Sequence, residues 1–395
     1  MNRLIGAMSG RVVSRAIGAV LQALTLIVVA RLTGPSDFGV FILWNSATLI
    51  LGGILSFGAS TRVLRQSAEE NPEITSWALF KVRWFSVGIS LVLILGALFS
   101  VGMPALGAIG VAFALADLVA DFESAWLAGA LRPVASSWTV VAQKALPAIS
   151  AVACLQIGGI WFLWCAPAVM TLWCLTRALP RRAPGIRLRG LVGSSRGYWA
   201  LTIVANLNLL EPLILRTGFG VQTVGLYSAA SRIGNPLTIF VSAMQTVFVP
   251  HFSKRDGTAK GTLRPILFVA SAYAVLVVVA SPLIVLVAVV LFGSEYNGSK
   301  PLIYAFVFAA AISAISQALQ VDLLIRGHAG LAATAIATGA TLGLVWLFIL
   351  GRIDWPDALP SVPIFSQVAI LVMMCFALLW SNSVGSSTPS EGTAE

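Results

Sequence analysis

The sequence predicts an all-α integral membrane protein of about twelve transmembrane helices, organised as two halves of six. Three observations lead to this prediction: the apolar composition, the placement of positive charge, and a faint internal repeat. The 395 residues are 58% hydrophobic and only 10% charged, with a mean hydropathy of +0.92. Soluble domains carry about 25% charged residues. The main solvent of this chain is therefore lipid.

Apolar stretches long enough to cross a bilayer follow one another along almost the whole chain. A span needs about 20 mostly apolar residues, and its backbone polar groups must all be paired, as in a helix or a closed barrel. Stretches of this length without strict apolar–polar alternation favour helices. The first run continues to Ala30 without a small-residue cleavage site, so we expect an uncleaved helix. The predicted helices, numbered one to twelve in this order, cover residues 11–31, 38–60, 78–101, 104–128, 134–157, 159–179, 198–218, 225–249, 265–292, 301–325, 329–350 and 361–381.

The net charge of +10 lies mostly on one side of the predicted membrane. With the N-terminus in the cytoplasm, twenty Lys and Arg residues, Lys144 among them, fall in inside loops and helix ends, and four fall outside. This is the positive-inside bias of multi-span membrane proteins, and it places both termini in the cytoplasm. Basic loops of this kind set topology and contact anionic membrane lipids, so no nucleic-acid partner is predicted.

The longest inside loop, residues 181–197, divides the chain into an N-terminal half, 1–180, and a C-terminal half, 198–381. A polar tail, 382–395, follows, and we expect it to be disordered. The halves share an echo: Gly39 and Gly225 lie 186 positions apart, and Arg31 and Arg216 lie 185 apart. Because an even number of spans separates the copies, the repeats run in the same sense, as in parallel-repeat transporters.

Three short motifs occur in order along the chain. They are Ala30-Arg-Leu-Thr-Gly-Pro-Ser-Asp-Phe-Gly-Val-Phe41, then Val224-Gly-Leu-Tyr-Ser-Ala-Ala-Ser-Arg232 running on to Phe248-Val-Pro-His251, and Phe292-Gly-Ser-Glu-Tyr296. Together with the span count and the half-length repeat, they resemble the polysaccharide-unit (O-antigen-type) flippase family of the multidrug/oligosaccharidyl-lipid/polysaccharide exporter superfamily.

The resemblance implies two pseudo-symmetric six-helix lobes around a central cavity, in the bacterial inner membrane. It implies a non-enzymatic function, the translocation by alternating access of undecaprenyl-pyrophosphate-linked oligosaccharide units for O-antigen, capsule or exopolysaccharide biosynthesis. The expected partners are this lipid-linked substrate, membrane lipids, a polysaccharide polymerase and chain-length machinery. Two alternatives stay open: a drug or cation antiporter of the same superfamily, which needs an anionic cavity, and a membrane polysaccharide polymerase or glycosyltransferase, which usually has a sizeable outside loop.

Charged residues within spans are the first candidates for function, because each costs about 2.5–3.5 kcal/mol on insertion scales. Glu211, close to Asn208 in helix seven, and Arg232 in helix eight are expected at similar depth, where they either pair or face one cavity. Pro212 is expected to kink helix seven. The Arg232 guanidinium suits phosphate oxygens. Arg232, together with Glu211 and the nearby Asn208, is therefore a candidate for the substrate path.

Arg15 and Arg62 lie near the inner ends of helices one and two. They either receive the headgroup on the cytoplasmic side or snorkel to the membrane surface. Asp117 and Glu211 are the candidate ion-coupling carboxylates. Asp117 and Asp121 share a helix face, where like charges repel.

Asp322 and Arg326 are four residues apart and are predicted to form a local ion pair. No catalytic, cofactor-binding or metal site is predicted, because the sequence contains no phosphate-binding loop, metal-ligand cluster or triad-like spacing.

Overall fold

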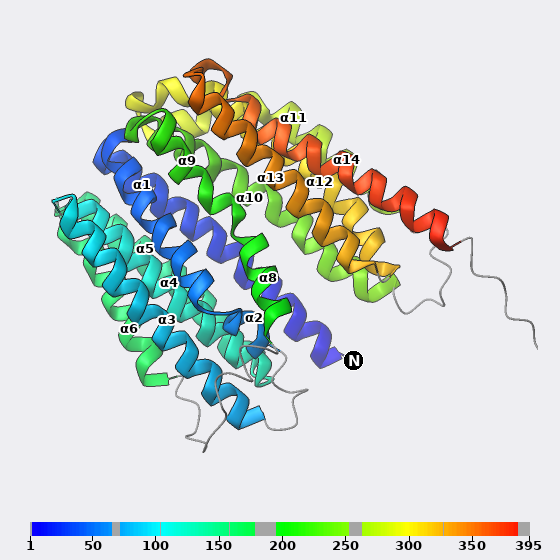
Figure 1. Ribbon diagram of the computed structural model, residues 1–395, viewed down its shortest axis with the longest axis horizontal. Coiled ribbons are helices and arrows are strands. Elements are labelled where there is room, and N and C mark those ends of the chain that lie inside the picture. Colours follow the sequence, from blue (N-terminus) through cyan, green and yellow to red (C-terminus); the bar gives the residue numbers. More distant parts are fainter. Residues whose placement is uncertain are drawn as a thin grey trace, which may run out of the picture.

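The computed structural model describes residues 2–64, 72–102, 104–157, 159–177, 195–252, 263–326 and 328–385, which form helices and turns without any strand. The elements, coloured along the chain in Figure 1, are α1 (Asn2–Leu55), α2 (Ala59–Val63), α3 (Pro72–Ser100), α4 (Ala105–Gly129), α5 (Pro133–Ile157), η2 (Ile160–Trp164), α6 (Cys165–Arg177), α8 (Arg196–Ala205), η3 (Leu207–Leu210), α9 (Glu211–Gly218), α10 (Val221–Phe252), α11 (Leu263–Phe292), η4 (Ser294–Ser299), α12 (Lys300–Ile325), α13 (Ala329–Arg352), η5 (Pro356–Ala358) and α14 (Ser361–Gly385).

Each predicted span coincides with helix in the described part of the chain. Eight of these helices are long and apolar enough to cross a membrane, and a bent pair brings the number to nine. One of the eight, Val13–Leu55, is 43 residues long and holds two predicted spans. The chain leaves helical geometry between them at Gly34 (φ 75°, ψ 169°), and Pro35 follows without an N–H donor. The remaining predicted ranges are occupied by α6 and α10.

The inter-lobe loop and the tail lie largely outside the described residues. The first residues of the predicted tail, 382–385, continue α14, and residues 386–395 are not described. Of the predicted loop, residues 181–194 are not described, and α8 begins at Arg196. The apolar helices make the fold that of a multi-pass, all-α membrane protein.

The helices pack as two lobes that meet along α1 and α10 (Figure 1). In the N-terminal lobe α1 packs on α4 and α5, and in the C-terminal lobe α10 packs on α12. The contact between α1 and α10 is the most extensive between any two elements. The two lobes are thus held together mainly by these two helices.

One apolar core joins the lobes at the end that the charge distribution assigns to the outside. Its buried members come from both lobes and include Phe41, Ile109, Tyr227, Tyr296 and Leu347. At the opposite end each lobe has apolar clusters of its own, with Leu79 and Phe122 in the N-terminal lobe and Leu323 and Met374 in the C-terminal lobe. The lobes therefore share packing at the outer end and have separate cores at the inner end.

Two glycines allow α1 and α10 to touch backbone to backbone at the outer end. A Cβ atom on Gly39 would collide with the carbonyl oxygen of Val221, and a Cβ atom on Gly225 would collide with that of Pro35. Gly39 and Gly225 are the equivalent positions of the internal repeat. The echo in the sequence thus corresponds to one physical contact between the two halves.

Helix seven is broken within the predicted span. α8 ends at Ala205, Asn206 follows as its C-terminal cap, and η3 leads into α9 after a bend of 49°. Pro212 lies in the first turn of α9, where the missing N–H of proline costs nothing. The predicted kink is present, but it lies at Asn206 rather than at Pro212.

α8 packs against the C-terminal end of α1 and against α2. The Thr61 and Thr202 hydroxyls are 3.2 Å apart, and Trp199 Nε1 donates to the Ile54 carbonyl oxygen at 2.9 Å. α8 therefore contacts the N-terminal lobe, although it lies at the start of the C-terminal half of the chain.

Candidate functional site

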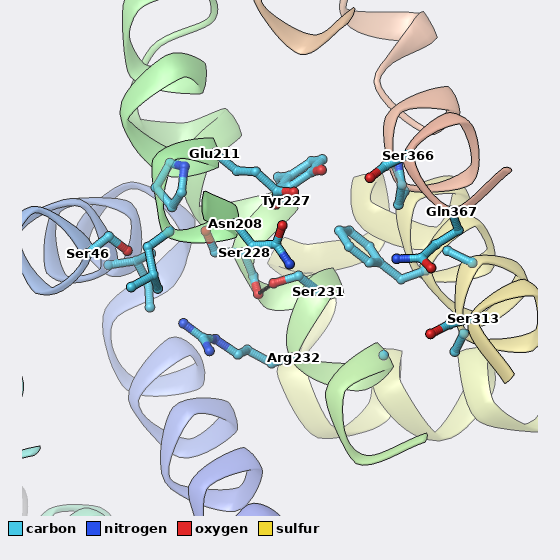
Figure 2. Close-up of a pocket in the computed structure, with 18 of the residues that line it drawn as sticks. Ser46, Asn208, Glu211, Tyr227, Ser228, Ser231, Arg232, Ser313, Ser366 and Gln367 are labelled. Carbon is cyan, nitrogen blue, oxygen red and sulfur yellow. Dashed lines mark hydrogen bonds between the residues drawn. The ribbon is translucent and has the colours of Figure 1, made fainter. Parts of the chain in front are cut away.

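A cavity of about 440 Å³ lies beside the break in helix seven, between the second half of α1 and the C-terminal lobe (Figure 2). Among its described lining residues, charge comes from Glu211 and Arg232 and aromatic surface from Tyr227 and Phe306. Most of the other side chains carry hydroxyl or amide groups: Ser46, Asn206, Asn208, Ser228, Ser231, Ser313, Gln317, Ser366 and Gln367. We call this space the large polar cavity.

The break in helix seven helps to explain both the place and the polarity of this cavity. Non-helical backbone at membrane depth is tolerated where it lines a water-filled space, and Asn206 and Asn208 border the cavity at the break. Glu211 is the first residue of α9. Its backbone N–H donates to the Asn208 carbonyl oxygen, so η3 runs directly into α9 and brings the Glu211 side chain to the cavity wall.

One face of α10 supplies the opposite wall. Tyr227, Ser228, Ser231 and Arg232 all line the cavity, and their spacing keeps them on neighbouring rows of one helix. The Tyr227 ring meets Phe306 edge to face, with ring centroids 5.1 Å apart. In Figure 2 the Arg232 guanidinium extends toward α1 and away from Gln367. α10 therefore carries positive charge to the boundary between the lobes.

Two buried polar atoms around this boundary, one from each lobe, lack a hydrogen-bond partner among the described residues: Ser46 Oγ and Arg232 Nε. A buried donor or acceptor left without a partner costs about 1–3 kcal/mol. Such a concentration of unpaired groups from both lobes is typical of a surface that pairs with a bound molecule.

A second, smaller cavity of about 40 Å³ lies on the N-terminal side of Arg232. Its polar lining consists of Gln22, Thr25, Asn45, Asp117, Lys144 and Arg232. Arg232 thus lines both cavities, and it interacts electrostatically with Asp117 on one side and Glu211 on the other. The guanidinium lies between a carboxylate of each lobe.

Hydrogen-bond donors relieve the expected repulsion between Asp117 and Asp121. Lys144 Nζ lies 3.0 and 3.1 Å from the two Asp117 carboxylate oxygens. Gln143 Nε2 donates to Asp117 at 2.8 Å and to Asp121 at 3.1 Å. The count of Lys144 among the cations of inside loops and helix ends was wrong, because the residue lies in the middle of α5 and pairs with a carboxylate.

The predicted site residues are distributed over three places. Asn208, Glu211 and Arg232 line the large polar cavity, and Asp117 lines the smaller one. Glu211 and Arg232 therefore face one cavity, which was one of the two arrangements expected. Arg15 is exposed on α1 and lines neither cavity.

Arg62 is only 8% exposed, and its Nη1 donates to Ser195 Oγ at 2.8 Å. It therefore ties α2 to the start of helix seven, outside both cavities. The predicted pair of Asp322 and Arg326 is confirmed, with 2.7 Å between Oδ2 and Nε.

Sequence reasoning missed several cavity residues. Gln317 and Gln367 carry no charge, so they do not interrupt an apolar span. A search for amides at the middle of spans would have found both, because each lies well inside a predicted helix.

Two lobes of helices joined at one end, with a polar cavity at a broken helix, are features found in multi-span transporter folds. Comparison with solved structures gives the same class. An inward-facing multidrug resistance MATE family transporter of the MOP superfamily is similar over 94% of this chain and 96% of its own, with 12% identity and a TM-score of 0.68. The outward-facing form of such a transporter matches over 96% of both chains, with 13% identity and a TM-score of 0.63.

A MOP superfamily transporter from Pyrococcus furiosus, described as having a binding pocket of reversed polarity, matches over 96% of both chains, with 12% identity and a TM-score of 0.61. No protein-family model matches the chain, and no curated protein matches it in sequence. At these identities the likeness shows the fold. That fold fits the superfamily expected from the motifs and does not distinguish the families within it.

Proposed function

We propose that this protein translocates a lipid-linked oligosaccharide across the bacterial inner membrane by alternating access. The observation that carries the proposal is the lining of the large polar cavity. Hydroxyl and amide side chains dominate it, and Arg232 brings positive charge to its edge. A cavity of this chemistry suits a molecule with many hydroxyl groups and an anionic linkage.

Sugar hydroxyls both donate and accept hydrogen bonds, and Ser, Asn and Gln side chains do the same. A site that presents many such groups discriminates strongly against apolar analogues, because these would leave its polar groups unpaired. The guanidinium of Arg232 offers a fork of donors that matches the oxygens of a pyrophosphate. The lining is therefore suited to both the sugar and the pyrophosphate of the headgroup.

The packing of the lobes supports loading from the cytoplasmic side. The shared core and the crossing of Gly39 with Gly225 close the outer end, whereas the inner ends of the lobes have separate cores. Release on the outer side then requires the lobes to part at that core. The bend in helix seven and the non-helical Gly34 are suitable hinges for this movement.

The proposed setting follows from the same function. The N- and C-termini lie in the cytoplasm, on the side of the basic loops. The substrate comes from glycosyltransferases at the inner leaflet, and a polysaccharide polymerase with its chain-length machinery receives it on the outer side. No catalytic role is proposed for the chain, whose structural neighbours are transporters.

A second candidate function is the export of drugs or cations. It is favoured by the solved structures with this fold, which include multidrug resistance transporters. Glu211 would be the attracting charge in that case. Arg232 at the edge of the same cavity argues against cationic substrates, because like charges repel in a low-dielectric site.

A deletion strain complemented with variants separates the two functions. We expect the deletion to remove surface polysaccharide and to leave lipid-linked units facing the cytoplasm. Wild type and Arg216→Gln, an exposed arginine at the end of α9, are expected to restore the polysaccharide, and Arg232→Gln is not. Unchanged polysaccharide together with new sensitivity to cationic dyes would overturn the proposal in favour of drug export.

A further inference from the structure

The small cavity between the lobes contains one cation from each lobe. Lys144 comes from the middle of α5, and Arg232 comes from α10. Both line the same space of about 40 Å³, which is large enough for a few water molecules. Two cations that face one small cavity repel each other unless an anion lies between them.

Asp117 is the resident anion of this cavity. It bonds Lys144 through both carboxylate oxygens, and it interacts electrostatically with Arg232. The side chains of Lys144 and Asp117 are 17% and 24% exposed, so neither is sealed away from the cavity. Arg232 Nε has no hydrogen-bond partner among the described residues. One cation is therefore neutralised directly, and the other is left with an unused donor.

We propose that Lys144 and Arg232 form a two-cation clamp for the pyrophosphoryl group of the substrate, and that Asp117 holds Lys144 in place while the clamp is empty. This inference rests on the proposed function, in which an anionic linkage joins lipid and sugar. The sugar lies in the large polar cavity, and its linkage lies at Arg232, where the two cavities meet.

The exchange of anions keeps the Lys144 ammonium compensated and leaves Asp117 beside Asp121, with Gln143 as a donor to both. Removing one partner from a buried ion pair is costly, because it leaves a charge without compensation. A pyrophosphoryl group that arrives at Lys144 replaces the Asp117 carboxylate, so the ammonium is never left alone. Asp117 keeps its hydrogen bond from Gln143 at 2.8 Å after it releases Lys144.

The clamp also links substrate binding to the arrangement of the lobes. Because its two cations belong to different lobes, an anion bound between them draws the lobes together on the inner side of the shared core. In the empty clamp, the Asp117 carboxylate is the anion that attracts both Lys144 and Arg232. Substrate binding therefore favours closure of the inner end, as alternating access requires.

Binding measurements on the purified full chain in nanodiscs test the clamp. The probe is farnesyl pyrophosphate, followed by microscale thermophoresis, with inorganic pyrophosphate as the lipid-free arm. We expect Lys144→Gln and Arg232→Gln each to weaken binding by about tenfold or more, the scale of a hydrogen bond to a charged group. Lys144→Arg is expected to retain binding. The matched control is Lys81→Gln, which removes an exposed lysine that stacks on Trp77.

Asp117→Asn gives the result that a purely structural ion pair cannot give. Without the competing carboxylate, both cations become available, so pyrophosphate binding is expected to tighten several-fold. If Asp117 serves only to stabilise the fold, the same substitution weakens binding or leaves it unchanged, and the clamp is refuted. Should Lys144→Gln fail to fold, Asp117→Asn and Lys144→Arg decide the matter.

The outcomes separate the clamp from the proposed function. Binding that depends on Arg232 but not on Lys144 overturns the clamp and leaves the flippase proposal in place. Absence of binding of either probe to the wild type overturns both. Binding of inorganic pyrophosphate with the same dependence on Lys144, Arg232 and Asp117 supports the clamp as a site for the anionic group itself.

Discussion

Gly39 and Gly225, equivalent positions of an internal repeat, lie against each other across the boundary between the two lobes. The position that a Cβ atom of Gly39 would occupy is only 3.1 Å from the backbone nitrogen of Gly225. Neither glycine is among the residues with positive φ, so the requirement at both positions is close approach rather than unusual backbone conformation. The pair brings the backbones of the two lobes into contact at the end that the charge distribution assigns to the outside.

Widening this crossing should open the outer end. Gly225→Val would place a branched side chain against the Pro35 carbonyl, so we expect the two helices to separate. The measurement is labelling of Ser228→Cys, a buried cavity residue, by a membrane-impermeant maleimide from outside, after replacement of the four native cysteines. Gly88→Val is the matched control, because a Cβ atom there meets nothing within 4 Å. Equal labelling in both variants would contradict this role.

The hydrogen bond between Tyr296 and Ala30 should stabilise the same end. Tyr296 Oη donates to the Ala30 carbonyl oxygen at 3.1 Å, and the side chain is 1% exposed. Tyr296→Phe removes only the hydroxyl and is expected to cost about 1 kcal/mol. Tyr296→Ala also removes the buried ring and is expected to cost about 3–5 kcal/mol. Thermal unfolding in detergent measures both, and identical melting of the Phe variant and wild type would show that the bond is not formed.

Glu211 is expected to couple transport to an ion gradient. Its carboxylate lies in the large polar cavity at the start of α9, and a neutral amide in its place cannot exchange a charge. In proteoliposomes we expect Glu211→Gln to bind substrate but to lose any response to an imposed proton or sodium gradient. Glu295→Gln, at an exposed site in η4, should respond as wild type does. A normal gradient response of Glu211→Gln would exclude this role.

The break in helix seven should be needed for movement rather than for binding. Asn206→Gln, which keeps an amide at the cavity, combined with Pro212→Ala favours a continuous helix across the 49° bend. We expect slower transport, with substrate binding largely kept because Arg232 is untouched. Pro282→Ala, within α11, controls for loss of a proline from a span. Transport at the wild-type rate in the double variant would show that the hinge lies elsewhere.

Much of the fold was accessible from the sequence, because it depends on local composition. Spans, their order and the division into halves follow from runs of apolar residues and from charged loops. The similar depth of Glu211 and Arg232 in neighbouring helices placed them close together, but it left open whether they pair or face one cavity. These properties need only a one-dimensional count along each helix.

The remainder depends on contacts that no local pattern encodes. Lys144 looks like an ordinary basic residue until α4 and α5 pack and bring Asp117 to 3.0 Å from it. The bend of helix seven lies at Asn206 rather than Pro212, because a proline in the first turn of a helix disturbs nothing. Gln317 and Gln367 belong to the cavity only because α12 and α14 turn those faces toward α10.

The shared core at the outer end also implies how the protein should respond to its surroundings. Apolar contacts depend little on ionic strength, whereas attraction between charged groups is screened by salt. Added salt should therefore act mainly on the charged groups around Arg232 and leave the outer closure largely unchanged. A membrane protein built in this way keeps the closure of its lobes and the charges of its cavities under separate physical control.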